Sequence, residues 1–260
     1  MKKVSIVINC DTRTEKNNQD GLFSGVVNTD FLSDGIHNKL LFFKGFETEL
    51  VVVVDEHNPI PEKELEYLRK ICDTLIIKKH REFPGFNDIN YFTGLAACTG
   101  DIIAHFDQDS AAFTSSPESV QRLINLLDTY DYVSYPSSVS PNPVIDPSFN
   151  FFWASTRFFM CKRETLDFSE LIKCRDYEYY IKTYNPSRVH PWTEHWLSAI
   201  SMKKGGKVFY PPMDLNQLAI FSWGSYTRFT LMRLNELPYE KVREFIFSKG
   251  GIHYPCDVSG

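Results

Sequence analysis

Four short runs of apolar and β-branched residues recur in the first half of the chain. They are VSIVIN at residues 4–9, ELVVVVD at 49–55, TLIIKK at 74–79 and DIIAHF at 101–106. Runs of this length and composition are typical of strands that are buried on both faces of a parallel sheet. The hydrophobic pattern therefore predicts four buried strands before residue 107.

Segments with helical spacing lie between and after these runs. Within residues 61–72, three apolar residues fall on one helical stripe: Leu65, Leu68 and Cys72. A further helix is expected after Ser115, which forms a candidate capping box with Glu118. The apolar residues behind that box also keep helical spacing: Val120, Leu123, Ile124 and Leu127. Alternation of strands and helices predicts an α/β fold with a mostly parallel central sheet and right-handed crossovers.

The pattern changes in the second half of the chain. Residues 136–147 form a proline-rich stretch without periodicity, and an aromatic, strand-like piece follows at 149–163. Residues 193–206 are expected to form a helix that ends at two glycines and leads into a strand, and 239–247 a further helix. We expect one domain over residues 1–260, with two functional halves that meet near residue 136.

Composition excludes several classes of protein. The formal net charge of −5 argues against a general nucleic-acid binder, which needs a basic surface. No apolar run approaches the roughly 18 residues of a membrane span, and the run near the N-terminus is too short for a signal peptide. The six cysteines show neither CxxC pairs nor zinc-like spacing, so we expect reduced thiols in a cytoplasmic protein. Peripheral contact with a membrane and the oligomeric state are left open.

Two carboxylates stand at the exit of the fourth apolar run. In GDIIAHFDQDS, Asp107 and Asp109 are separated only by Gln108. In an extended stretch, residues i and i+2 point to the same side, and ligands of open parallel sheets bind at the carboxyl ends of the strands. Mg²⁺ is usually held by one or two carboxylates together with substrate phosphates. The pair therefore suits a cation that binds a diphosphate, whereas two solvated turn residues are the alternative.

Four segments, taken in order, resemble the family 2 glycosyltransferases. They are VSIVINCDTR, ELVVVVDEH, NDINYFTGLAACTGDIIAHFDQD and TEHWLSAISMKKGGKVFYPP, which together run from about residue 3 to residue 212. The resemblance implies a single GT-A domain. Its Rossmann-like half, residues 1–135, would bind the nucleotide-sugar, and residues 136–260 would bind the acceptor. It also implies transfer of a sugar from a nucleotide-diphosphate donor to the hydroxyl of a carbohydrate or glycan, with Mn²⁺ or Mg²⁺ as cofactor.

The resemblance also assigns donor-binding residues. Asp55, at the end of the second strand, would bind the nucleoside, and Arg13 could pair with a phosphate. Gln108 and Asp107 belong to the same donor site. The resemblance also points to two segments without choosing one residue in each: the loop after the first strand, and the segment before the helix that leads to the fourth strand. The candidates there are Cys10, Asp11, Asn87, Asp88 and Asn90. A UDP-sugar is slightly favoured as donor.

A base for the acceptor hydroxyl is expected near the helix that begins around residue 193. The acidic pair of the family corresponds to Glu194 and His195, where many members have aspartate at the second position. Either Glu194 or His195 could take the proton, since imidazole and carboxylate are both common general bases. The same residues would also suit a helix start. Asp176 is a reserve candidate for the base, and His253 a candidate third metal ligand.

Two other functions stay open at this stage. A sugar nucleotidyltransferase would also use an α/β sheet and aspartate-bound metal, but NCDTRTEKNNQDG lacks the glycine-rich basic loop that such an enzyme normally has after its first strand. A degenerate transferase domain that binds a sugar or a protein without turnover is the second alternative, suggested by histidine at residue 195. A dinucleotide-binding oxidoreductase is disfavoured because no GxGxxG follows the first strand.

Overall fold

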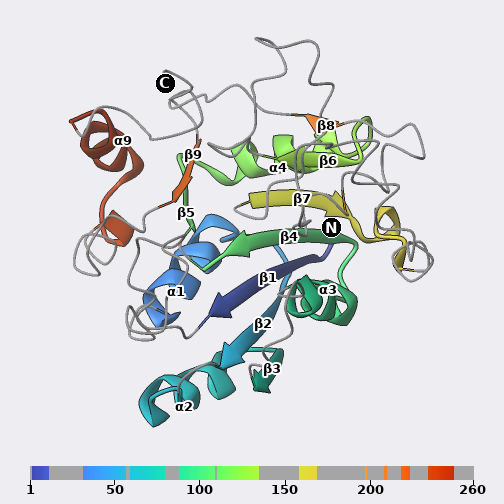
Figure 1. Cartoon of the computed structure of the whole chain (residues 1–260). Coiled ribbons are helices and arrows are strands. Elements are labelled where there is room, and N and C mark those ends of the chain that lie inside the picture. The colour runs from blue at the N-terminus through green and yellow to red at the C-terminus, as the bar shows by residue number, and fades with distance from the viewer. Residues whose placement is uncertain are drawn as a thin grey trace, which may run out of the picture.

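The fold was analysed in a computed structural model. It describes residues 2–11, 32–56, 59–79, 88–108, 110–134, 158–168, 197, 208–209, 218–222 and 234–248. Its central element is a seven-stranded sheet with the order β3-β2-β1-β4-β7-β6-β8 (Figure 1). The strands are β1 Val4–Asp11, β2 Thr48–Glu56, β3 Thr74–Lys79, β4 Ile102–Asp107, β6 Tyr132–Ser134, β7 Phe158–Lys162 and β8 Val208–Phe209.

The four apolar runs form the parallel part of this sheet, as the sequence predicted. β1 pairs in parallel with β2 on one side and β4 on the other, and β3 pairs in parallel with β2. β7 runs antiparallel to both β4 and β6, whereas β8 is parallel to β6. The α/β prediction with a mostly parallel sheet is therefore confirmed.

Side chains alternate between two cores on the two faces of the sheet. Ile6 and Ile8 of β1 belong to the larger cluster, which also contains Phe42 and Phe43 at the end of α1. Val7, between them, belongs to the smaller cluster with residues of α3. Burial on both faces explains why β1, β2 and β4 are mostly apolar on both sides. The predicted burial of the third run was wrong, because β3 is the edge strand and Ile77 is 40% exposed. Figure 1 shows α1 and α3 on opposite sides of the sheet.

The helices are α1 Leu32–Phe42, α2 Glu62–Ile71, α3 Asp88–Ala97, α4 Pro117–Leu126 and α9 Tyr239–Ser248. The predicted helices after Pro61, after Ser115 and at 239–247 are thus present. The capping box was wrong, however, because α4 begins one residue later, with Ser116 as N-cap, Pro117 in the first turn and no side-chain cap hydrogen bond. Proline fits this position because it needs no N–H there.

A second, two-stranded sheet lies beside the main one. β5 (Ser110–Thr114) follows β4 directly and pairs antiparallel with β9 (Leu218–Ser222). Strands from beyond residue 136 therefore join both sheets: β7 and β8 the large one, β9 the small one. Within the described part of the aromatic segment, Phe158–Lys162 form a strand and a 3₁₀ turn follows at Arg163–Thr165. The proline-rich stretch and nearly all of the helix predicted at 193–206 lie outside the described residues.

Two glycines of the GLAACTG motif let α3 approach the sheet. A Cβ built on Gly94 would lie 2.8 Å from Val53 Cγ2 and 3.0 Å from Val7 Cγ1. On Gly100, it would lie 2.7 Å from Ser5 Oγ. Because real Cβ atoms do not come this close, both positions require the absence of a side chain. The motif thus has a packing role in this chain.

Candidate functional site

The candidate site lies at the edge where β1, β2 and β4 end. Asp107 is the last residue of β4 and pairs in register with Asn9 of β1. Asp11 at the end of β1 pairs in register with Asp55 of β2. Three aspartates predicted from the sequence therefore come together at one edge through the parallel pairing of their strands. This is the edge at which open α/β sheets bind ligands.

The carboxylate of Asp107 is held by a tyrosine that the sequence did not single out. Tyr91, in the first turn of α3, donates its hydroxyl to Oδ1 of Asp107 at 3.0 Å. Both side chains are half-buried. A donor in a fixed position restrains a carboxylate, because it favours the side-chain rotamer that can accept the hydrogen bond. Tyr91 thus fixes the first residue of the candidate metal pair.

A stack of rings fixes Tyr91 in turn. Its ring lies 5.2 Å from that of His105, and the His105 ring stacks on Phe159 at 5.1 Å with an interplanar angle of 8°. Nε2 of His105 lies 2.6 Å from Nδ2 of Asn9. A buried wall from β1, β4 and β7 therefore supports Tyr91 behind the edge.

Not every predicted donor-binding residue presents its side chain at this edge. Cys10 is buried in the larger core, so a contact between this residue and the donor would run through its backbone. Asn90 lies within α3, and Gln108 is half-buried directly after β4. The described residues hold only the backbones of Asp11, Asp55, Asp88 and Asn90. The other candidates lie outside them: Arg13, Asn87, Asp109, Asp176, Glu194, His195 and His253.

The described part of the chain contains no group of three or more His, Cys, Asp or Glu side chains that could hold a metal ion by themselves. Asp107 nevertheless supplies the oxygen ligand that a hard divalent cation prefers. A cation bound here would take ligands from Asp107, from a residue outside the described ranges and from the donor. Asp109 is the sequence-based choice for that second ligand.

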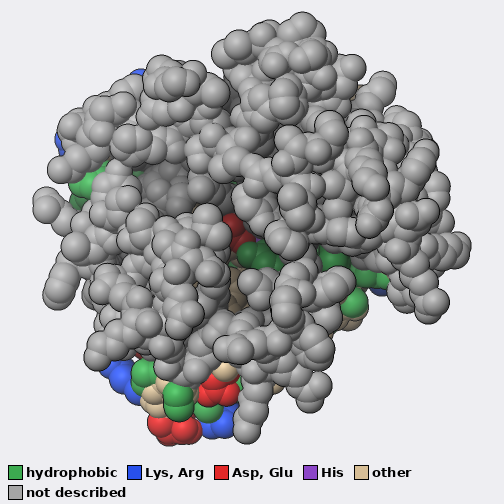
Figure 2. Space-filling model, in the orientation of Figure 1, with side chains coloured by type: hydrophobic (Ala, Val, Ile, Leu, Met, Phe, Trp, Pro, Cys, Tyr) green, Lys and Arg blue, Asp and Glu red, His purple; other side chains and the backbone are tan. Residues whose placement is uncertain are grey.

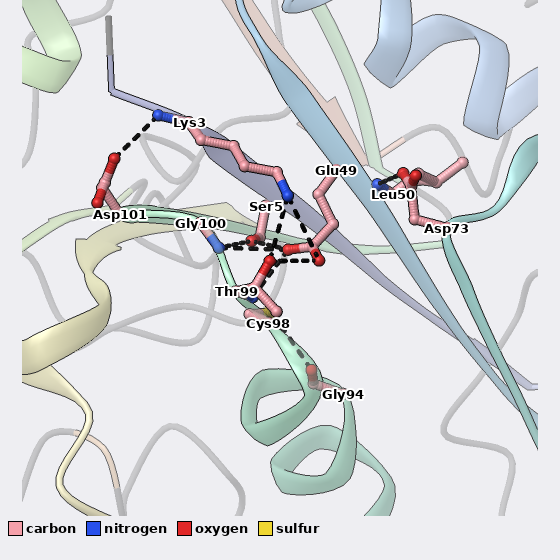
Figure 3. Close-up of polar contacts among 10 residues, drawn as sticks. All are labelled: Lys3, Ser5, Glu49, Leu50, Asp73, Gly94, Cys98, Thr99, Gly100 and Asp101. Carbon is pink, nitrogen blue, oxygen red and sulfur yellow. Dashed lines mark hydrogen bonds and ion pairs between the residues drawn. The ribbon is translucent and has the colours of Figure 1, made fainter.

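A second polar cluster lies at the opposite edge of the sheet, where β1 and β2 begin. The buried Glu49 carboxylate accepts hydrogen bonds from Ser5 Oγ, from the Thr99 amide at 2.8 Å and from the Thr99 hydroxyl at 2.7 Å (Figure 3). The amide of Gly100 lies 3.3 Å and Nζ of Lys3 3.8 Å from the same carboxylate. These contacts join the end of α3 to β1 and β2. The cluster is structural, because its carboxylate is occupied by the protein's own donors.

The described cysteines are not suited to nucleophilic chemistry. Burial, with Glu49 nearby, raises the pKa of Cys98 to about 12, and burial beside Asp73 raises that of Cys72 to about 12. Cys161 is fully buried and its pKa is also raised. Cys72, Cys98 and Cys161 form no disulfide. These three thiols are therefore protonated at neutral pH.

Charged side chains are visible in two places on the face of the molecule shown in Figure 2. In Figure 2, Lys, Arg, Asp and Glu side chains gather at the lower edge, over α2. Its exposed residues carry both signs: Glu62, Lys63, Glu66, Arg69 and Lys70. Near the centre of the same view, a small area of acidic and hydrophobic side chains is visible. Among the described helices, none is long and apolar enough to cross a bilayer.

Comparison of the sequence with protein-family models and with curated proteins gives no match. Solved structures with the same fold were found. The glycosyltransferase GlyE of Streptococcus pneumoniae is 10% identical, with a TM-score of 0.52 over 96% of this chain and 64% of GlyE. A nucleoside-diphosphate-sugar pyrophosphorylase of Vibrio cholerae is 12% identical, with a TM-score of 0.50 over 87% of this chain and 99% of the pyrophosphorylase.

A third structure is the mannosyltransferase PcManGT of Pyrobaculum calidifontis, solved with GDP-Man and Mn²⁺. It is 15% identical, with a TM-score of 0.48 over 81% of this chain. The chain spans 55% of the length of PcManGT. Identities of this size establish the fold alone. The likeness to GlyE and to the pyrophosphorylase shows that the chain shares their α/β fold, which is the GT-A-like fold that its resemblance to family 2 glycosyltransferases predicted.

Proposed function

We propose that the chain is a metal-dependent glycosyltransferase, which moves a sugar from a nucleotide-diphosphate donor to an acceptor hydroxyl. The observation that carries the proposal is the position of Asp107. Its carboxylate ends β4 at the carboxyl edge of a GT-A-like sheet and is oriented by Tyr91. The carboxyl-terminal ends of β1 and β2, which carry Asp11 and Asp55, lie at the same edge of the sheet.

Asp107 and Asp109 would hold Mn²⁺ or Mg²⁺ together with the donor diphosphate. When bound, the cation supplies positive charge that offsets the charge on the diphosphate leaving group. Asp55 would accept a hydrogen bond from the base or ribose, and Arg13 would contact a phosphate oxygen. A UDP-sugar or a GDP-sugar fits this description, with UDP slightly favoured.

The acceptor hydroxyl would lose its proton to Glu194, with His195 as the alternative base. Its oxygen forms the new bond to the anomeric carbon while the bond from that carbon to the diphosphate oxygen breaks. Attack from the face opposite the leaving group inverts the anomeric configuration. Residues beyond 136 would provide this acceptor half, and we treat the whole chain, residues 1–260, as one transferase domain.

Donor turnover tests the proposal. The wild-type protein is incubated with UDP-glucose, UDP-GlcNAc or GDP-mannose in the presence of Mn²⁺, and release of the nucleoside diphosphate is measured. We expect slow hydrolysis of one donor without an acceptor, and loss of that activity in Asp107→Asn and Asp109→Ala. Asp128→Asn is the matched control, because Asp128 is exposed and its carboxylate pairs with Lys2 and Lys162 instead. Equal hydrolysis by all four proteins would contradict the proposal.

A nucleotidyltransferase is the second candidate. The pyrophosphorylase of Vibrio cholerae supports it, because its TM-score of 0.50 extends over 99% of that chain. Such an enzyme joins a sugar phosphate to a nucleoside triphosphate and releases pyrophosphate. Pyrophosphate release from UTP or GTP that depends on a sugar 1-phosphate would favour this second function, whereas diphosphate release from a nucleotide-sugar favours the first.

A further inference from the structure

Lys39 is buried deep in the protein, although lysine is rarely found there. It lies in the third turn of α1, and its side chain is 0% exposed. Burial of an ammonium group costs free energy unless its N–H groups find hydrogen-bond acceptors and its charge is offset by nearby groups. Its contacts should therefore indicate what the buried charge does.

The ammonium group binds the backbone on both sides of residue 109. Nζ donates to the carbonyl oxygen of Gln108 at 3.3 Å and also to the carbonyl oxygen of Ser110. It lies 5.9 Å from the centre of the Phe106 ring, on the β4 side of the same turn. A single cation thus contacts the last part of β4, the turn and the first residue of β5.

The neighbouring residues of α1 bind the same segment. Oδ1 of Asn38 accepts a hydrogen bond from the amide of Ala112 at 2.8 Å, and its Nδ2 donates to Asn235 at 2.8 Å. One turn earlier, a Cβ on Gly35 would lie 3.5 Å from the carbonyl oxygen of Gln108. The helix therefore lies directly against the turn between β4 and β5 and against the first residues of β5.

This turn carries the residues that the proposed function assigns to the metal and the diphosphate. The two carbonyl groups bound by Lys39 belong to the residues immediately before and after Asp109 in the sequence. A carbonyl oxygen bound by an ammonium group restrains the peptide plane that contains it, here the planes that follow Gln108 and Ser110. The sequence of α1 alone does not predict these contacts.

We propose that Lys39 is a positioning residue. By binding the carbonyl groups of Gln108 and Ser110, its buried ammonium group holds the turn that follows Asp107, to which the proposed function assigns the metal-binding Asp107 and Asp109. This inference rests on the proposed function, because it assumes that the two aspartates bind a metal with the donor diphosphate.

Calorimetric titration of UDP and of GDP, each with Mn²⁺ and with EDTA, tests the inference on the full chain. The readout is the ratio of the nucleotide affinity measured with Mn²⁺ to the affinity measured with EDTA. Partial unfolding lowers both affinities equally and leaves this ratio unchanged. In Lys39→Met, which keeps the chain length without the charge, we expect the ratio to fall about tenfold or more. Lys44→Met is the matched control, since Lys44 is exposed just after the same helix, and its ratio should equal that of the wild type.

Lys39→Arg keeps the inference testable if the methionine variant does not fold. A guanidinium group keeps the charge but cannot place one nitrogen between two carbonyl groups in the same way, so we expect a smaller loss of the ratio, about threefold. A wild-type ratio in a folded Lys39→Met or Lys39→Arg protein would overturn the inference and leave the proposed function standing. No effect of Mn²⁺ in the wild type would overturn both.

Discussion

The buried carboxylate of Glu49 should contribute strongly to stability, and Glu49→Gln measures that contribution. Glutamine keeps the shape but replaces one acceptor oxygen by an NH₂ donor. That donor would face groups that are themselves donors: the Thr99 amide and hydroxyl, the Gly100 amide and Ser5 Oγ. Hydrogen bonds to a charged group are worth about 1.5–3 kcal/mol each. Loss of two of them predicts destabilisation of about 3 kcal/mol or more.

The effect should also depend on pH in a defined direction. Burial alone would raise the pKa of Glu49, but the hydrogen bonds from Ser5 and Thr99 and the charge of Lys3 outweigh it and hold the pKa below the ordinary 4.5. A carboxyl group whose pKa is lower in the folded state stabilises the fold above pH 4.5. That stabilisation is lost as the pH falls through the folded-state pKa.

Urea unfolding of the wild type and Glu49→Gln, followed by circular dichroism at pH 7 and at intervals down to pH 3, gives both results. We expect a lower midpoint for the variant at pH 7 and convergence of the two midpoints below pH 4.5. Asp128→Asn is a control for loss of an exposed carboxylate and should change the midpoint little. Equal midpoints at pH 7, or a gap that widens in acid, would refute the reasoning.

Three further predictions concern single residues near α3. Tyr91→Phe removes the hydroxyl that binds Asp107 and should weaken Mn²⁺-dependent binding of nucleoside diphosphate about two- to tenfold in calorimetry, with little change in melting temperature. Gly94→Ala places a Cβ 2.8 Å from Val53 Cγ2 and should cost about 1–3 kcal/mol in urea unfolding. Cys98, whose pKa burial and Glu49 raise to about 12, should react with iodoacetamide at pH 8 only after unfolding in urea.

Each of these outcomes has a matched comparison. Tyr67→Phe on α2 lies away from the edge and should leave Mn²⁺-dependent binding unchanged, so equal losses in both tyrosine variants would contradict the role of Tyr91. Gly35→Ala meets no atom closer than 3.5 Å and should be tolerated, whereas a stable Gly94→Ala protein would disprove the close approach of α3. Labelling of Cys98 in the native protein at the rate of the unfolded chain would show that its thiol is accessible and ionised.

The parallel sheet could be predicted because its signal is local. β1, β2 and β4 are almost continuous apolar runs, and burial on both faces is the simplest reason for such runs. β3 has a similar run of apolar residues, but it lies at the edge of the sheet and is only partly buried. Asp107 could be predicted at the carboxyl edge of the sheet because it follows the fourth apolar run directly. The start of α4 was one residue off because Ser115 and Ser116 are both acceptable caps, and only the backbone conformation distinguishes them.

The supports of Asp107 could not be predicted, because each depends on a contact between distant segments. Lys39 meets the carbonyl group of Gln108 across 69 positions in the chain, and Tyr91 meets Asp107 across 16. In the sequence, Lys39 resembles any polar residue on a helix. His105 is recognisable only as a polar residue within an apolar strand. Only the packing of α1 and α3 on opposite faces of the sheet shows what these side chains contact.

The central claim is that Asp107 helps to bind a divalent cation at the carboxyl edge of the sheet. Calorimetric titration of UDP and GDP into the wild type and Asp107→Asn, with Mn²⁺ and with EDTA, tests it most directly. The account predicts that Mn²⁺ tightens binding of one nucleotide to the wild type at least tenfold and has no effect on the variant. Nucleotide binding that is unaffected by Mn²⁺ in both proteins, or equally tightened in both, would contradict it.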